Sequence, residues 1–170
     1  ASQSFLEVKL LETKMAIEQG ADEIDIVLNL GEFFAGQYEN CTNEIRAIKQ
    51  LMGTKKLKVI LESGILKSQK DVVKAAEIAI AGGADFIKTS TGKVTIGATL
   101  EAVQTICQVI KRHEVQTNNK IGVKVSGGVR SYQDAVTYYQ LIARELGAAY
   151  LNPNLFRIGA SSLLDDLITI

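Results

Sequence analysis

The chain has 170 residues, with 19 Lys or Arg and 19 Asp or Glu, so its formal net charge is zero. A chain of this length can bury a hydrophobic core, and a balanced charge gives no general field that would attract nucleic acid or an anionic membrane. The sequence contains neither an apolar stretch of the ~20 residues that span a membrane nor a recognisable signal peptide, so we expect no membrane association.

Helix-like and strand-like segments alternate along the chain without a linker or low-complexity stretch. Residues 6–19 carry apolar side chains at helical spacing, and Gly20 follows where a helix C-cap glycine belongs. Residues 23–29 then alternate between two faces, as a strand does. The further predicted elements are a helix over 43–52, a strand over 57–61, a helix from Ser68 to near Gly82, a strand over 86–89, a helix over 100–112, a strand over 122–125, a helix from Ser131 to Gly147, a strand over 156–158 and a short helix over 161–167.

The spacing of the strands is typical of a parallel sheet built from βα units. Strands recur about every 30 residues, with helical segments between them and nearly continuous apolar runs. Residues 20–25 also align with residues 83–88, which gives Asp25 and Lys88 equivalent positions in their strands. A doubly wound sheet and a (βα)8 barrel both fit this pattern, although no GxGxxG motif supports the doubly wound sheet.

Polar residues in the apolar strands favour the barrel. They come from four different strands and are Asp25, Glu62, Lys88 and Lys124. Only a barrel brings residues of so many strands to one axis. We therefore predict an α/β fold of the (βα)8 TIM barrel family.

Two lysines stand in strands where lysine is costly. Lys88 closes an apolar strand just before a Thr/Ser/Gly loop, and Lys124 repeats this arrangement before Ser126. Lysine is depleted in strands and is almost never fully buried without a partner. If the two amines lie close together, their charges repel and favour the neutral form, which is nucleophilic and can form a Schiff base.

Glycine-rich loops follow the late strands. Residues 126–130 expose backbone N–H groups beside Arg130, residues 159–162 open the last short helix, and residues 91–93 add a further glycine and a cation. Phosphate sites in barrels are commonly built from the loops after the last two strands and an extra helix. Each glycine pair alone could equally form a tight turn, but together they favour a phosphate site.

The cysteines and the histidine carry no catalytic pattern. Cys41 and Cys107 lie in helix-like segments without metal-ligand or CxxC spacing, so we expect free thiols and a reducing, cytoplasmic compartment. His113 is the only histidine and lies in a charged run, which predicts a solvated helix end rather than a catalytic base.

Five blocks of the sequence resemble the 2-deoxyribose-5-phosphate aldolase family. They are residues 22–27, 58–62, 86–93, 122–130 and 156–164, in the same order as in the family. The resemblance implies a class I aldolase on a (βα)8 barrel, without metal or cofactor. Such an enzyme reversibly splits 2-deoxy-D-ribose 5-phosphate into acetaldehyde and D-glyceraldehyde 3-phosphate.

The resemblance also implies roles for individual residues. Lys88 matches the Schiff-base lysine, Lys124 the lysine that perturbs it, and Asp25 the acid of the proton relay. The positions that match the family's phosphate site are Gly92, Lys93, Gly127, Gly128, Arg130, Gly159, Ser161 and Ser162. The implied partners are a small sugar phosphate and an aldehyde, with no nucleic acid and no membrane. The oligomeric state stays open and includes a homo-oligomer.

Alternative functions remain open at this point. Asp25 could simply neutralise a buried lysine, a role that is compatible with proton transfer. A phosphate-binding barrel isomerase or epimerase would need a carboxylate base but no nucleophilic lysine. A catalytically silent chain could bind a sugar phosphate or a partner.

The number of strands predicts part of a barrel. We count five strands, whereas a (βα)8 barrel typically needs about 250 residues and eight strands. We therefore expect residues 1–170 to form the C-terminal part of a single barrel domain, about its last five βα units, and to belong to a longer enzyme or to close with a partner chain. All of the additional length is expected before Ala1.

Overall fold

Helices and strands alternate along residues 3–168, the part of the chain that the computed structural model describes. The strands are β1 (Glu23–Val27), β2 (Lys56–Ile60), β3 (Phe86–Lys88), β4 (Gly122–Ser126) and β5 (Phe156–Gly159). The helices are α1 (Leu6–Glu18), α2 (Leu30–Phe34), α3 (Tyr38–Met52), α4 (Gln69–Ala81), α5 (Leu100–Thr117), α6 (Tyr132–Leu146) and α7 (Leu163–Ile168), with single 3₁₀ turns at Ser63–Ile65 and Ala148–Tyr150. None of the helices in this described region is both long and apolar enough to cross a membrane.

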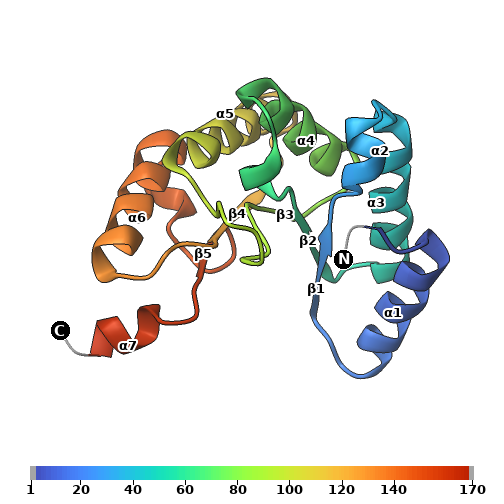
Figure 1. Cartoon of the computed structure of the whole chain (residues 1–170), viewed down its shortest axis with the longest axis horizontal. Helices are drawn as coiled ribbons and strands as arrows, with labels where there is room; N and C mark the ends of the chain where they lie inside the picture. The colour runs from blue at the N-terminus through green and yellow to red at the C-terminus, as the bar shows by residue number, and fades with distance from the viewer. Residues whose placement is uncertain (1–2, 169–170) are drawn as a thin grey trace.

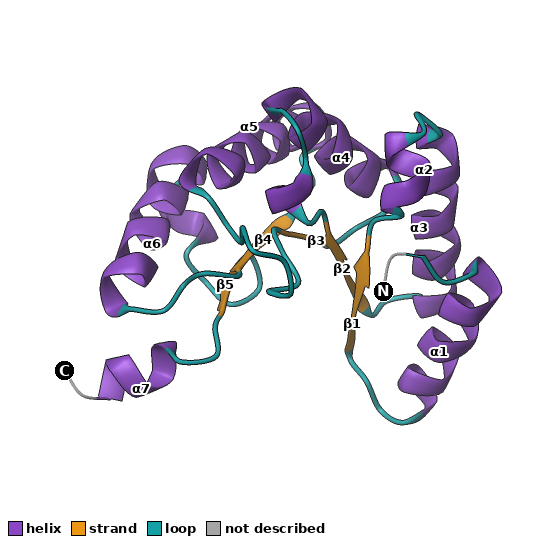
Figure 2. Ribbon diagram, in the orientation of Figure 1, coloured by secondary structure: helices purple, strands orange, loops and turns teal. Residues whose placement is uncertain are grey.

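The five strands form one parallel sheet in the order β1-β2-β3-β4-β5. Helices α3, α4, α5 and α6 lie along one side of this curved sheet, and β1 and β5 are its outer strands (Figure 1). Coloured by secondary structure, the strands form an inner arc and the helices an outer one (Figure 2). The predicted five-stranded, parallel, barrel-type architecture is confirmed, and the sheet is open.

The two faces of the sheet differ in chemistry because side chains alternate along each strand. The residues on the helical side are apolar and join one hydrophobic core with the helices, and those on the strands include Ile26, Leu57, Val59, Ile87, Val123 and Val125. The other face is concave and carries the polar side chains. The fold therefore separates a stabilising outer face from an inner face that is available for chemistry.

An ion pair between the two outer strands shows how strongly the sheet curves. Neighbouring strands lie about 4.8 Å apart, so the first and fifth strands of a flat sheet would be roughly 19 Å apart, farther than one side chain can reach. Arg157 on β5 nevertheless donates two hydrogen bonds to Glu23 on β1, one of them at 2.7 Å. The inner face is therefore a deep concavity in which side chains of both outer strands meet.

The element boundaries differ from the prediction in two helices. The helix predicted over 43–52 begins at Tyr38, whose ring packs 5.4 Å from that of Phe33. The helix predicted over 100–112 continues to Thr117 and ends at Asn118, which has a left-handed backbone (φ 56°). Charged and polar residues on the solvent side interrupt the apolar pattern in both segments without ending the helix.

Side-chain caps fix the starts of several helices. Ser131 and Asp134 form the predicted capping box of α6, with each side chain accepting from the other residue's backbone N–H. The Ser68 side chain accepts from the backbone N–H of Asp71 at the start of α4. Asn29 caps the short helix α2, which the sequence analysis did not predict, by accepting from Glu32 at 3.3 Å.

Candidate active site

The three predicted catalytic residues meet on the inner face of the sheet. Lys88 Nζ donates a hydrogen bond of 2.6 Å to Asp25 Oδ2, and Lys124 Nζ lies 3.9 Å from the same oxygen. Lys88 and Lys124 are Cα partners on adjacent strands β3 and β4, so their side chains project from the sheet side by side. The structure therefore brings together the two lysines and the acid that the sequence singled out.

Lys58 on β2 belongs to the same cluster, although the sequence does not predict it as a site residue. It is buried, and its Nζ lies 2.6 Å from Asp25 Oδ1 and 2.9 Å from Glu23 Oε2. Its sequence signal is the same as that of Lys88, a lysine within an apolar strand. The preceding Lys55 and Lys56 disguise this signal, because the run resembles a solvated segment.

The charges of the cluster alter the pKa values of Asp25 and Lys124, among others. Burial would raise the pKa of Asp25, but hydrogen bonds from Lys58 and Lys88 outweigh it and hold this pKa below its ordinary value. Burial lowers the pKa of Lys124, and the nearby charge of Lys88 lowers it further, while Asp25 acts in the opposite direction. The repulsion predicted between the two lysines therefore acts on Lys124.

Glu62 does not take the role that the sequence analysis gave it. It was expected to converge on the same axis as the lysines, but its carboxylate accepts from the backbone N–H and the hydroxyl of Thr91, at 3.1 and 2.6 Å. The carboxylate turns toward this loop because Glu62 follows the end of β2 and has a left-handed backbone (φ 54°). Glu62 thus anchors the loop that carries Gly92 and Lys93.

A pocket of about 450 Å³ lies beside the lysines at the carboxyl ends of β3, β4 and β5. Lys88 and Lys124 line it together with seven of the eight residues that were predicted for phosphate, namely Gly92, Lys93, Gly127, Gly128, Arg130, Gly159 and Ser161. Ser162 is exposed at the start of α7 and is not among the lining residues. The pocket combines backbone amides and four cationic side chains, which suits an anionic group.

The backbone of Gly127 and Gly128 requires glycine. Both residues have a positive φ, 84° and 87°, which side chains with a Cβ rarely adopt. A Cβ at Gly97 would also lie 2.2 Å from the carbonyl oxygen of Gly127, and the backbone N–H of Ala98 donates to this carbonyl at 2.8 Å. The loop after β3 therefore supports the loop after β4 from behind.

Gly159 leaves room for the Lys124 side chain. A Cβ at this position would lie 3.1 Å from Lys124 Cε and 3.1 Å from Ser126 Cβ. Since Gly159 also lines the pocket, this glycine at the end of β5 serves both the lysine and the space next to it.

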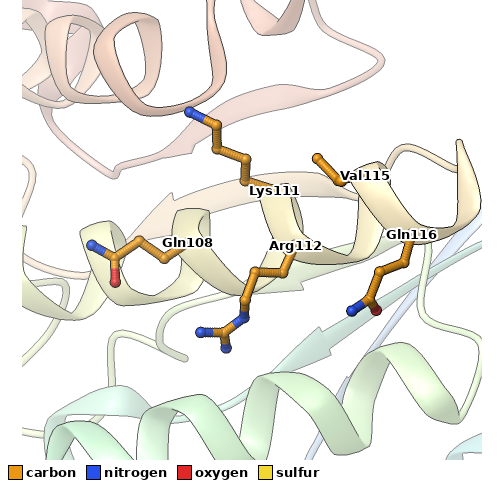
Figure 3. Close-up of a pocket in the computed structure, with 5 residues that line it drawn as sticks. All are labelled: Gln108, Lys111, Arg112, Val115 and Gln116. Atoms are coloured by element: carbon orange, nitrogen blue, oxygen red, sulfur yellow. The ribbon is translucent and has the colours of Figure 1, made fainter.

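A second hollow of about 430 Å³ lies on the outer surface and contains none of the predicted site residues. It is formed by side chains that project from α5 (Figure 3): Gln108, Lys111, Arg112, Val115 and Gln116. These residues are exposed. The hollow is lined by exposed side chains of one helix, whereas the inner pocket is formed by strand ends and tight loops.

The cysteines behave as predicted and the histidine does not. Cys41 and Cys107 are free and buried, and burial raises the pKa of both thiols, to about 11 and about 12. His113 lies inside α5 rather than at a helix end, because this helix continues to Thr117. Its Nε2 is buried and has no hydrogen-bond partner within the described residues.

The fold and the site together define a barrel-type α/β protein with clustered lysines beside a cationic, glycine-lined pocket, an arrangement suited to aldolase chemistry. The chain belongs to the DeoC/LacD family of aldolases, which matches residues 1–167. The resemblance seen in the sequence is thereby confirmed.

Named relatives support this assignment. Human deoxyribose-phosphate aldolase is 44% identical over 167 residues, which are 98% of this chain and 52% of the human protein. The apo-form crystal structure of a Toxoplasma gondii protein superimposes with a TM-score of 0.90 at 27% identity, covering 99% of this chain and 67% of that one. For the tetrameric deoxyribose phosphate aldolase of Aeropyrum pernix the TM-score is 0.74 at 31% identity, with 98% and 62% covered. The chain spans about half the length of the curated relatives it matches.

Proposed function

We propose that this chain carries the active site of a class I aldolase that reversibly cleaves 2-deoxy-D-ribose 5-phosphate into D-glyceraldehyde 3-phosphate and acetaldehyde. The observation that carries the proposal is the position of Lys88, which lines a cationic, glycine-rich pocket and contacts Asp25 at 2.6 Å. The names of the similar proteins indicate the substrate. In this reading residues 1–170 belong to a single barrel domain.

Lys88 is the nucleophile in this proposal. An ordinary lysine, with a pKa near ~10.4, is almost entirely protonated at pH 7. The inner face holds four cations, Lys58, Lys88, Lys124 and Arg157, against the two carboxylates Glu23 and Asp25, an excess of two positive charges (4 − 2). Burial and the charge of Lys88 lower the pKa of Lys124, so the lysine pair can supply a neutral amine for attack on a carbonyl carbon.

The remaining steps use the neighbouring side chains. Attack of Lys88 on the substrate aldehyde and loss of water give an iminium, which withdraws electrons and permits cleavage of the adjacent carbon–carbon bond. Asp25 moves protons during carbinolamine and enamine formation, directly or through a water. The glycine loops with Lys93 and Arg130 hold the phosphate, and this remote binding positions the reacting carbon.

Borohydride trapping tests the proposal. Wild-type protein treated with acetaldehyde and borohydride should gain the mass of one reduced imine, on a peptide that contains Lys88. Modification confined to Lys93 or Lys124 would overturn the assignment of the nucleophile. An isomerase or epimerase, or a chain that only binds a sugar phosphate, would give no covalent adduct.

We also propose a cellular compartment, partners and an oligomeric state for the enzyme. The two buried free thiols suit a reducing compartment, so we place the protein in the cytoplasm. Its partners are a small sugar phosphate and an aldehyde. The tetramer of the Aeropyrum pernix protein supports assembly into a homo-oligomer.

A further inference from the structure

The Glu23–Arg157 pair lies on the inner face beside the lysines, with Arg157 as the Cα partner of Lys124, and takes no part in the reaction steps proposed above. Glu23 accepts from both terminal nitrogens of Arg157 and contacts Lys58 Nζ at 2.9 Å. Lys58 in turn contacts Asp25 at 2.6 Å, and Asp25 contacts Lys88 at 2.6 Å. The result is a chain of alternating charges that begins at Arg157 and ends at Lys88.

The Arg157 guanidinium is held on three sides. Its Nε donates to the Pro153 carbonyl at 2.7 Å, its terminal nitrogens bind Glu23, and its Cζ lies 4.9 Å from the centre of the Phe86 ring. The Phe86 ring can lie over β4 because Gly122 has no side chain there; a Cβ would approach the ring to 2.4 Å. Arginine cannot lose its proton in a protein, so this end of the chain is a fixed positive charge.

We propose that Glu23 and Arg157 are positioning residues, which fix Lys58 so that Asp25 is held against Lys88. Without this pair, Asp25 would be the one carboxylate of the described residues that still contacts Lys58, and Lys58 would draw it away from Lys88. The inference rests on the proposed aldolase function for its kinetic consequence, but the charge coupling can be measured without it.

If Glu23 and Arg157 act on Lys124 through their charges, they must change its pKa in opposite directions. A purely structural role would not require this. The charges that act on Lys124 are those of Lys88 on β3, Asp25 on β1, Lys58 on β2 and Arg157 on β5, and Glu23 on β1 binds both Lys58 and Arg157. Lys93 and Arg130 lie around the adjoining pocket. Removing a carboxylate destabilises the ammonium form of Lys124, whereas removing a cation stabilises it. Glu23→Gln and Arg157→Gln should therefore have opposite effects.

Competitive acetylation, followed by peptide mass spectrometry, measures how fast Lys124 reacts at each pH. The midpoint is the pH at which Lys124 reaches half of its maximal reactivity. We expect this midpoint to move down by about half a pH unit in Glu23→Gln and up by a similar amount in Arg157→Gln. It should return close to the wild-type value in the double variant. Midpoints that stay fixed or move in the same direction would overturn the proposal.

Kinetics test the positioning itself. Glu23→Gln and Arg157→Lys should lower kcat about tenfold through displacement of Asp25, with KM for the sugar phosphate changed less than about twofold. Arg157→Lys keeps the charge but not the bidentate contact, so its Lys124 midpoint should stay near that of wild type. Arg157→Lys and Glu23→Gln together test whether the pair positions Asp25, even if Arg157→Gln does not fold. An unchanged kcat in both would refute the positioning role.

Matched controls come from the outer surface. The exposed pair Arg112–Glu77, at 3.7 Å, joins α5 to α4 away from the site. Arg112→Gln and Glu77→Gln should leave the Lys124 midpoint and kcat unchanged. If wild type fails to trap acetaldehyde, the aldolase proposal fails, whereas the labelling midpoints still report whether Glu23 and Arg157 act on Lys124.

Discussion

The two faces of the sheet are made by the same five strands and differ in almost every other respect. Ile87 and Lys88 are neighbours on β3, yet Ile87 is fully buried in the apolar core under the helices and Lys88 points into the concavity. On the outer face an apolar side chain can be replaced by another of similar volume at little cost in stability. On the inner face each charge of the lysine cluster lies within 4 Å of an opposite charge; these residues are Glu23, Asp25, Lys58, Lys88, Lys124 and Arg157.

In this barrel-type sheet the outer face stabilises the fold, and the inner face carries the groups that can do chemistry. Burial of the outer face lowers the free energy of the folded state in proportion to apolar area. The charges of the inner face raise the free energy of the folded state, since desolvated charges are unfavourable unless they are paired. The excess of positive charge left there is unfavourable for folding and favourable for a nucleophilic amine.

The largest expected effect is the loss of Lys88. Lys88→Ala should abolish aldehyde trapping and cleavage and leave the fold intact, because it removes one side chain from an open concavity. The matched change on the other face is Ile87→Ala, which should destabilise the fold by about 2–5 kcal/mol and retain trapping while folded. Circular dichroism, urea unfolding and borohydride trapping of both variants check the contrast. Residual cleavage by Lys88→Ala at the wild-type rate would contradict it.

Loss of the second lysine should have the next largest effect. Lys124→Leu removes a positive charge beside Lys88, so the acid limb of the rate profile should move to higher pH and the rate at neutral pH should fall by about tenfold or more. Lys111→Leu removes an exposed lysine on α5 and should leave the profile unchanged (Figure 3). A neutral-pH rate that is unaffected in Lys124→Leu would rule out the charge-repulsion argument.

The sequence predicts much of the inner face because lysine in an apolar strand is rare enough to be informative. That rule located Lys88 and Lys124, and the alignment of two strand motifs placed Asp25 with them. The same rule applies to Lys58 but failed there, because a lysine-rich run precedes it. The glycine loops were recognised from their composition, and the structure places them around one pocket.

The other contacts of the site depend on the three-dimensional geometry of the sheet, which the order of residues in the sequence does not predict. The Glu23–Arg157 contact joins residues 134 positions apart and exists only because the sheet curves. The turn of Glu62 toward Thr91 depends on one left-handed backbone residue after β2. Alternation along a strand predicts which face a side chain occupies, but not which partner it meets across the concavity.

A moderate effect is expected in the phosphate loop. Gly128→Val should raise KM for 2-deoxyribose 5-phosphate far more than for free deoxyribose, because the branched side chain blocks close approach of the phosphate to the backbone amides. Gly147 has nearly the same φ, 88° against 87°, lies in equally open space and follows α6 away from the pocket. Gly147→Val therefore controls for backbone strain. Equal changes of KM for both substrates in Gly128→Val would mean that the loop is only structural.

The smallest expected effect concerns stability in acid. The hydrogen bond from Arg157 and the contact with Lys58 outweigh burial and lower the pKa of Glu23 from its ordinary 4.5 to about 2. Because the folded value lies below the unfolded one, ionised Glu23 stabilises the fold above pH 4.5, and this contribution is lost as the pH falls from 4.5 to about 2.

The difference in the free energy of unfolding between wild type and Glu23→Gln isolates this contribution, since the other carboxylates titrate in both proteins. Urea unfolding at pH 6, 4, 3 and 2.5 should give the full difference at pH 6 and a progressively smaller one below pH 4.5. Glu77→Gln, at a half-exposed position on the helical surface, should differ from wild type by no more than about 0.5 kcal/mol at any of these pH values. A Glu23→Gln difference that stays constant from pH 6 to pH 2.5 would show that the Glu23–Arg157 pair contributes shape rather than charge to the inner face.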